Sequence, residues 1–358
     1  MGEYGGERIW LSRLPDRLAG ETVPRWLVAL AGYSVLPLVL TASFYASATA
    51  PWSVTLWVAM GFGLLFNLVA PPLVWYYDTV VLPGFFAEVR ELVVEDSLPE
   101  RERIAGRYQR FFARRYVYTA IPWMALILAI AVFAVDFQRA LGVGGLGDPV
   151  YPLYLCYYLW GGLVTGIGFH GMLTTVLCIR EFTASVDLRI DPLHPDGLGG
   201  LGAFGFLAIR TTLMTSLGAL LLPMGFEMAA GQGLEWLVGT AILLYTLFIA
   251  GTFVYPTLRV HRVADELRER SLDRLREEIH GLPGQLSPVE RPSDAGSDDV
   301  DNRELAVQLE IQRLRREYRE YADVKLYPMS VSILAQLVGS VLLPLFFLLL
   351  DLALSRVL

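Results

Sequence analysis

The residues with the clearest capacity for chemistry lie in one loop between two long apolar segments. Within ten residues this loop carries three carboxylates and an imidazole, from Asp187, Asp191, His194 and Asp196. Oxygen and nitrogen ligands of these kinds bind divalent cations. Five glycines between residues 197 and 205 permit positive φ angles and a close approach of the backbone to a ligand. The loop is therefore the first candidate for an ion-binding site.

Two other interpretations of this loop are open. The glycine-rich turn can present backbone N–H groups to an anion, with the guanidinium of Arg210 about one to two turns further along the chain. Alternatively, Asp191 and Asp196 accept hydrogen bonds from nearby backbone N–H groups, and the loop is a capped turn that holds no ligand. None of the three interpretations indicates a cofactor or a particular metal.

A second set of polar residues lies within the apolar segment 151–179. His170 and Thr174 stand about one helical turn apart there. Gly162 and Gly166 have the spacing of small residues that lets a neighbouring helix approach closely. An intramembrane histidine can carry protons, or it can donate a hydrogen bond to the next helix, which is the simpler interpretation.

The chain that must position these residues has the composition of a membrane protein. Of its 358 residues, 54% are hydrophobic and 18% are charged, and the mean hydropathy is +0.46. Long runs without a charged residue are comparable to the ~17–25 residues that a helix needs to cross a bilayer. They predict an all-α integral membrane protein with about seven transmembrane helices, at residues 26–48, 52–77, 117–137, 151–179, 206–227, 235–257 and 328–350.

Basic residues predict the orientation, because Lys and Arg are retained on the cytoplasmic side of a membrane. With the N-terminus inside, 27 of the 29 Lys and Arg residues fall in cytoplasmic segments, and only Arg139 and Arg356 fall outside. The sequence therefore predicts a multi-pass protein of the cell membrane with a cytoplasmic N-terminus and an outer C-terminus.

This topology divides the chain into five regions. They are an N-terminal segment with the first two spans (1–77), a cytoplasmic helical hairpin (78–116), spans three to six with a glycine-rich cytoplasmic loop at 180–205 (117–257), a cytoplasmic helical stalk with a flexible linker at 281–302 (258–327), and the last span with the outer C-terminus (328–358). The second arm of the stalk has a heptad seam, formed by Val307, Ile311, Leu314, Tyr318 and Tyr321. We expect the two arms to pack as an antiparallel coiled coil.

Several classes of function are excluded by what the sequence lacks. A net charge of −7 without a basic stripe argues against binding to nucleic acid. The only lysine, Lys325, lies at the edge of the last predicted span, so a retinal Schiff base in the middle of the membrane is excluded. No Gly-Lys pair exists to form a phosphate-binding loop. No catalytic residue is indicated, and an enzyme is the least favoured class because it would depend on the acids and imidazole of the loop alone.

The candidate loop also resembles a string found in other proteins. His194-Pro195-Asp196-Gly197-Leu198-Gly199-Gly200-Leu201 is similar to the His-Pro-Asp-x-x-Gly-Gly-Leu string of uncharacterised prokaryotic multi-pass membrane proteins. Those proteins also resemble this chain in having a charged helical pair before a last span that opens with proline, here Tyr327-Pro328. The resemblance implies no established activity, but it draws attention to the loop.

The function expected from these features is that of a channel or transporter for a small ion. The span at 151–179 and the loop at 187–205 would line its cytoplasmic mouth. The alternative is a membrane sensor or scaffold that recruits a soluble partner through the stalk at 258–327. Both leave room for assembly with further copies of the chain in the lipid bilayer.

Overall fold

The computed structural model describes residues 7–19, 23–196, 198–229, 233, 235–281 and 297–324, together with residues 339, 342, 346, 347 and 349. Within these residues all regular secondary structure is helical, and the one β interaction is an isolated antiparallel bridge between Val93 and Leu188. The all-α prediction is therefore confirmed for the described part of the chain.

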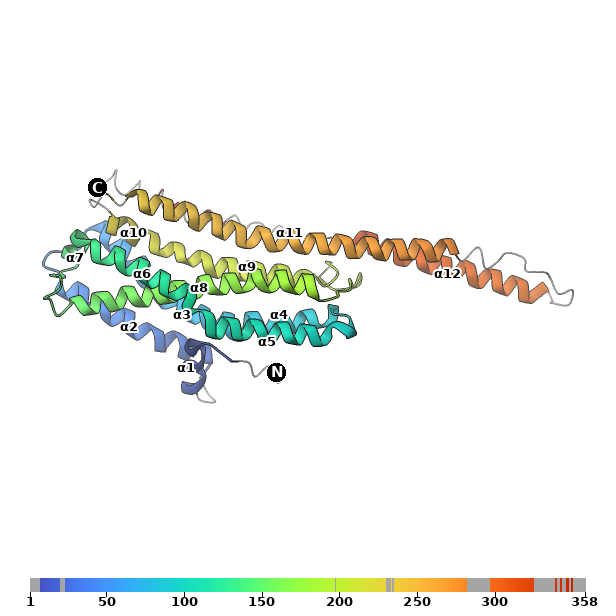
Figure 1. Cartoon of the computed structure of the whole chain (residues 1–358), viewed down its shortest axis with the longest axis horizontal. Helices are drawn as coiled ribbons and strands as arrows, with labels where there is room; N and C mark the ends of the chain where they lie inside the picture. The colour runs from blue at the N-terminus through green and yellow to red at the C-terminus, as the bar shows by residue number, and fades with distance from the viewer. Residues whose placement is uncertain are drawn as a thin grey trace.

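The helices carry the labels used in Figure 1. The α-helices are Trp10–Leu18 (α1), Arg25–Ser47 (α2), Val54–Tyr76 (α3), Leu82–Glu88 (α4), Leu98–Arg115 (α5), Val117–Phe133 (α6), Val135–Ala140 (α7), Tyr151–Ser185 (α8), Gly202–Ser216 (α9), Leu222–Ala229 (α10), Glu235–Gly281 (α11) and Ser297–Asp323 (α12). Short π or 3-10 segments join some of them, at Tyr77–Val81 (η1), Val89–Leu92 (η2), Glu95–Ser97 (η3) and Leu217–Leu221 (η4).

Six helical stretches in the described residues are long and apolar enough to cross a membrane. They are Arg25–Ser47, Val54–Leu92, Glu95–Phe133, Tyr151–Ser185, Gly202–Ala229 and Ile242–Gly281. Each contains or overlaps one of the first six spans predicted from the charge-free runs. The predicted seventh span, 328–350, lies outside the described residues apart from five positions. The described part of the chain thus has six helices of the kind expected in a multi-pass membrane protein.

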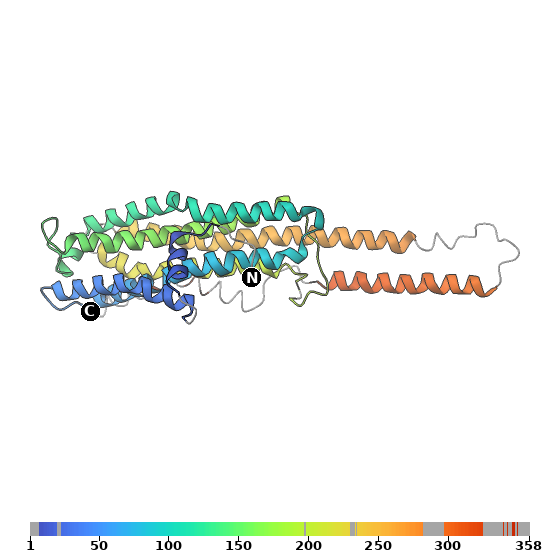
Figure 2. The same ribbon diagram turned by 90° about the horizontal axis from the view of Figure 1, so that it is seen from below.

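The long helices run side by side along one direction, the short α1 lies across it, and one pair of long helices extends beyond the rest (Figures 1 and 2). We call this pair the stalk and define it as residues 265–281 of α11 together with α12. The hairpin of α4 and α5 and the loop between α8 and α9 lie at the end of the bundle from which the stalk projects (Figure 1). We call this end the stalk end.

The helices α6 and α8 pack closely because two glycines of α8 face α6. A Cβ atom at Gly162 would lie 2.8 Å from the Cα atom of Met124, and a Cβ at Gly166 would overlap the Cα atom of Ala120. Neither glycine can therefore carry a side chain without moving the backbone of α6. This is the close helix contact that the spacing of the two glycines predicts.

At the stalk end, α4 and α5 form an antiparallel pair that extends α3 and α6 beyond the predicted spans. In α5 the buried residues Ile104, Tyr108 and Phe112 recur every fourth residue, and five of the six arginines of the helix lie on the exposed face, while Arg101 is fully buried. In α4, the rings of Phe85 and Phe86 pack against Phe182 of α8. The amphipathic pattern is what lets these helices continue past the purely apolar segments.

The N-terminal helix α1 is also amphipathic, and the sequence analysis did not predict it. Leu11 is fully buried, and the carboxylate of Asp78 in η1 accepts a hydrogen bond from the backbone N–H of Ile9 at 3.2 Å. The helix is thereby held against the stalk end of α3.

The stalk consists of the end of α11 and of α12, which returns beside it (Figure 2). No break interrupts α11 from Glu235 to Gly281, a length of 47 residues. Leu275 of α11 and Leu314 of α12 are buried, and Arg276 donates a hydrogen bond to the hydroxyl of Tyr318 at 2.8 Å. The residues of the predicted heptad seam are all buried or half-buried, as is required if they pack against α11.

Candidate functional site

The loop between α8 and α9 is organised around the carboxylate of Asp196. Its Oδ1 atom accepts hydrogen bonds from the backbone N–H groups of Leu198 (2.8 Å) and Gly200 (3.0 Å), and its Oδ2 atom accepts one from Gly202 (3.0 Å). The Nδ1 atom of His194 lies 2.9 Å from the same Oδ1. Backbone donors that could hold an external anion are thus occupied by a carboxylate of the chain itself.

Two glycines of the loop are required by its backbone conformation. Gly199 and Gly200 have φ angles of +67° and +90°, which residues with a side chain rarely adopt. A side chain at Gly200 would also overlap Leu92, and one at Gly199 would overlap Ile190. The glycines therefore let the turn pack against η2 and against its own first residues.

The same hydrogen bonds determine the pKa of Asp196. Burial raises this pKa, but the hydrogen bonds from Leu198, Gly200, His194 and Gly202 together outweigh burial and hold it below its ordinary value. The carboxylate is therefore charged at neutral pH, and its charge is satisfied within the loop.

The other carboxylates of the loop have separate partners. Asp187 accepts a hydrogen bond from the hydroxyl of Ser97 at 3.3 Å, and Asp191 accepts one from the backbone N–H of Leu193 at 3.0 Å. In the described part of the chain, no three His, Cys, Asp or Glu side chains form a group that could hold a metal ion. This arrangement matches the capped-turn interpretation, and a bound ion at the loop stays a prediction.

Arg210 lies apart from these side chains. It is exposed on α9, and its guanidinium lies 5.8 Å from the centre of the Phe206 ring on the same helix. The described hydrogen bonds of Asp187, Asp191 and Asp196 are made with other groups. The structure therefore brings His194 and Asp196 together and leaves Arg210 outside that pair.

The loop also supports the stalk, a relation that the sequence analysis did not predict. The hydroxyl of Tyr321 lies 3.5 Å from the carbonyl oxygen of Ile190, to which it donates. Val324, just after α12, shares one apolar cluster with Ile190 and Leu201. The end of α12 thus rests on the loop that Asp196 orders.

His170 joins α8 to α5. Its Nε2 atom lies 3.0 Å from the carbonyl oxygen of Phe111, and its ring stacks on the rings of Phe111 and Phe112 at 4.7 and 5.9 Å. Because a carbonyl can only accept, Nε2 carries the proton in this contact. Thr174 donates to the carbonyl of His170 within α8 at 2.7 Å. The geometry is that of an interhelical hydrogen bond, which was the simpler interpretation of this histidine.

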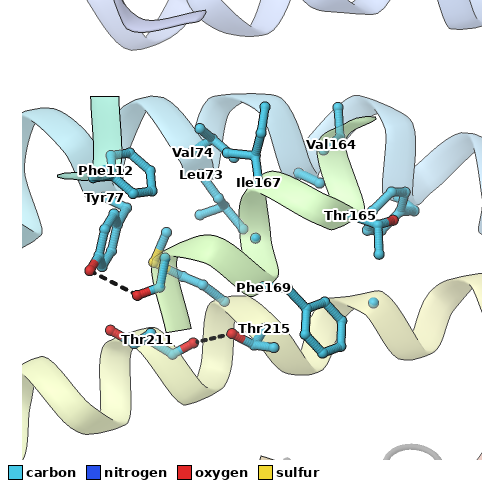
Figure 3. Close-up of a pocket in the computed structure, with 16 residues that line it drawn as sticks. Leu73, Val74, Tyr77, Phe112, Val164, Thr165, Ile167, Phe169, Thr211 and Thr215 are labelled. Atoms are coloured by element: carbon cyan, nitrogen blue, oxygen red, sulfur yellow. Dashed lines mark hydrogen bonds between the residues drawn. The ribbon is translucent and has the colours of Figure 1, made fainter. Parts of the chain in front are cut away.

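A small cavity with a hydroxyl-bearing wall lies between α3, α8 and α9, beside His170. Its volume is about 50 Å³, and Tyr77, Thr211 and Thr215 face it together with Phe169 (Figure 3). Tyr77 donates to the carbonyl of Gly171 at 3.0 Å, a contact drawn as a dashed line in Figure 3.

Hydroxyl groups link three elements around this cavity. Thr175 lies 2.8 Å from the hydroxyl of Tyr77 and 3.0 Å from that of Thr211. The proton of Thr211 is donated to the carbonyl of Leu207 at 2.8 Å, so Thr175 must donate to Thr211. The series of donors therefore ends at a backbone carbonyl. It ties η1, α8 and α9 together.

A larger cavity adjoins the first one. Its volume is about 190 Å³, and it shares Thr165, Phe169 and Gly218 with the smaller cavity. Residues of α3, α6, α8, η4, α10 and α11 line it, and most of these residues are apolar. The interior of the bundle thus contains two neighbouring spaces.

A charged cluster at the stalk end joins α5 to α8. Glu181 accepts hydrogen bonds from Arg107 at 2.7 Å, from Arg103 at 3.3 Å and from the hydroxyl of Tyr108 at 2.8 Å. The sequence analysis missed this cluster, and it also missed the hydroxyl groups around the small cavity. The paired threonines within apolar segments, Thr174-Thr175 and Thr211-Thr212, were the available signal for the latter.

Comparison with known proteins finds no relative of this chain. No family model, no curated protein and no solved structure matches the chain.

Proposed function

We propose that the protein is a membrane sensor or scaffold, in which a seven-span helical bundle anchors a cytoplasmic stalk that recruits a soluble partner. The observation that carries the proposal is the contact between the loop and the stalk, where Tyr321 of the stalk and Val324, the residue that follows α12, lie against Ile190. A change in the order of the loop removes part of the support on which the stalk rests.

The helix α11 supplies the second part of the argument. It is continuous from the bundle into the stalk, and its residues Val260 and Ala264 are buried in the same apolar cluster as Ile190. The backbone hydrogen bonds of a helix resist bending, and they couple the two ends of α11 except at Pro256, which has no N–H to donate. The bundle and the stalk are therefore mechanically connected by both α11 and the loop.

The stalk offers a surface that its own packing does not use. Leu305 and Leu309 lie one turn apart on α12 and are 56% and 58% exposed. The arginines Arg313 and Arg316 follow on the same helix, and both are exposed. Apolar side chains bordered by charge are typical of an interaction surface.

The test is capture of soluble proteins by the full-length chain in lipid nanodiscs. We expect a defined set of proteins to bind the wild type and to be lost from the double variant Leu305→Glu, Leu309→Glu. The matched control is Leu146→Glu, which changes a residue that is 93% exposed at the far end of the bundle. Identical captured sets for all three proteins would contradict the proposed role of the stalk.

A channel or transporter for a small ion is the second candidate. The two adjoining cavities favour it, because they lie inside the bundle and share Thr165, Phe169 and Gly218. The series of hydroxyl donors argues against it. The last proton of the series is donated to the carbonyl of Leu207, which has no proton to pass on. Flux of sodium, potassium, protons or chloride into proteoliposomes above that of protein-free vesicles would support this candidate, and its absence for all four ions would remove it.

A further inference from the structure

The larger cavity combines an apolar wall with polar atoms that have no partner. Asn67, Tyr157 and Tyr158 line it, and all three residues are almost completely buried. In the described structure the Asn67 Oδ1 atom and both tyrosine hydroxyls make no hydrogen bond. Buried polar groups normally have partners, and an unmet group disfavours the folded state. These three groups therefore point to a missing partner.

The hydrogen-bonding needs of these groups are complementary to a hydroxyl. The Nδ2 atom of Asn67 already donates to the carbonyl of Gly63 at 2.9 Å, which leaves Oδ1 as an acceptor. The hydroxyl of Tyr157 lies close enough to the side chains of Asn67 and Thr41 to interact with both, but neither contact meets the distance and angle of a full hydrogen bond. A tyrosine hydroxyl that lacks an acceptor can donate. The missing partner must then both accept and donate, as an alcohol or phenol does.

The size and lining of the cavity define the rest of the ligand. Its volume of about 190 Å³ exceeds the roughly 150 Å³ of an apolar cavity that is known to accommodate benzene. Around the polar atoms the wall is formed by side chains such as Ile127, Leu222 and Met228. A single ring with a few alkyl carbons fits this space, whereas a group of water molecules would leave the apolar wall wetted.

The wall of the cavity reaches the surface of the bundle at α6. Leu126 of this helix lines the cavity and is 42% exposed. In a bilayer this surface meets the acyl chains. A molecule dissolved in the lipid can therefore reach the cavity without crossing water.

We infer that this cavity is a binding site for a lipid-soluble alcohol or phenol of about one ring, whose hydroxyl donates to Asn67 and accepts from Tyr157. The inference concerns the interior of the bundle and does not depend on the proposed function of the stalk. Nothing in it requires the loop at 187–202 to bind an ion.

The test uses two probes that share a carbon skeleton. Thymol is a phenol with a ten-carbon skeleton, and p-cymene is the same skeleton without the hydroxyl. Binding to the full-length chain in nanodiscs is measured by equilibrium dialysis, with empty nanodiscs as the reference for partition into lipid. We expect about one thymol per chain and an affinity about tenfold higher than that for p-cymene, because two hydrogen bonds of ordinary net strength distinguish them.

Three variants locate the site and its polar group. Gly225 lines the cavity, and a Cβ atom built there meets nothing within 4 Å, so Gly225→Leu should fill the space and abolish binding of both probes. Gly61→Leu is the matched control, since Gly61 is exposed, lies outside the cavity lining and is equally open. Asn67→Leu should bind both probes with similar affinity.

Each outcome decides the inference. The inference is overturned if the wild type binds neither probe more strongly than empty nanodiscs do. That is the result expected if the cavity holds only water. Equal binding of both probes to the wild type would overturn recognition of the hydroxyl. Binding that survives Gly225→Leu would place the site elsewhere. The preference for thymol in the wild type and its loss in Asn67→Leu are the supporting results, and a protein that merely folds less well cannot produce that change of preference.

Discussion

At the scale of single residues, Asp196 has the largest effect on local structure among the residues of the loop. Its carboxylate accepts hydrogen bonds from Leu198, Gly200 and Gly202, which fixes the turn on which Tyr321 rests. The sequence analysis identified this residue but left three interpretations open. Sequence spacing cannot show which backbone N–H groups converge on a carboxylate, because convergence depends on the φ angles of Gly199 and Gly200.

The first prediction concerns the stability that Asp196 provides. Asp196→Ala should lower the free energy of unfolding by about 1–2 kcal/mol at neutral pH, since backbone donors lose their acceptor. Thermal unfolding of the purified chain in detergent measures the difference from wild type. Glu266→Ala is the control, because its ion pair with Arg270 at 3.8 Å is exposed and should contribute little. A variant as stable as wild type would show that the carboxylate does not order the turn.

The pH dependence of this stability follows from the lowered pKa of Asp196. A carboxyl group with a lowered pKa in the folded state stabilises that state above its unfolded pKa, about 3.9. The difference between wild type and Asp196→Ala should therefore be constant between pH 5 and 7. It should decrease as the pH falls below about 4 and the carboxylate is protonated in both states. A difference that grows at acidic pH would contradict the assigned pKa direction.

At the scale of helices, the sequence predicted where apolar segments lie better than where helices end. Charge-free runs located six of the helices that are long enough to span a membrane. They did not show that α3 continues through η1 into α4, or that α5 leads into α6 after a short turn. Hydrophobicity changes where a helix leaves the lipid, whereas the helix itself continues as long as an apolar face such as that of Ile104 and Phe112 is buried.

The cavities were beyond prediction for a different reason. Their walls combine residues from up to six elements, and the distances between those elements are determined by packing. The spacing of Gly162 and Gly166 predicted a close helix contact, but it could not name α6 as the partner. The paired threonines of α8 and α9 signalled polar groups inside the membrane without showing that Thr175 and Thr211 meet.

The second prediction concerns the packing of α6 on α8. Gly166→Leu should destabilise the bundle by about 1–3 kcal/mol or prevent its accumulation, because the new side chain overlaps the backbone at Ala120. Gly32→Leu, where a Cβ meets nothing within 4 Å, is the control. Melting temperatures in the same detergent compare them. Equal stability of the two variants would mean that α6 and α8 are further apart than described here.

At the scale of the whole molecule, the third prediction is the orientation in the membrane. The basic residues predict that a reporter inserted at Gly296 is cytoplasmic and that one fused after Leu358 is extracytoplasmic. In the structure the stalk, the α4–α5 hairpin and the loop between α8 and α9 share one end of the bundle (Figure 1), so all three should respond alike. An external signal at Gly296 would reverse the proposed orientation.

The connection between loop and stalk is the central claim of the proposed function, and a distance measurement tests it most directly. Spin labels at Leu309→Cys on α12 and Glu102→Cys on α5 both occupy exposed positions, and Cys156→Ser removes the exposed native thiol. Electron paramagnetic resonance in nanodiscs then gives the distribution of distances between the stalk and the bundle. We expect one narrow distribution when Asp196 is present and a broader or shifted one in Asp196→Ala. An unchanged distribution in the variant would contradict the claim that the loop positions the stalk.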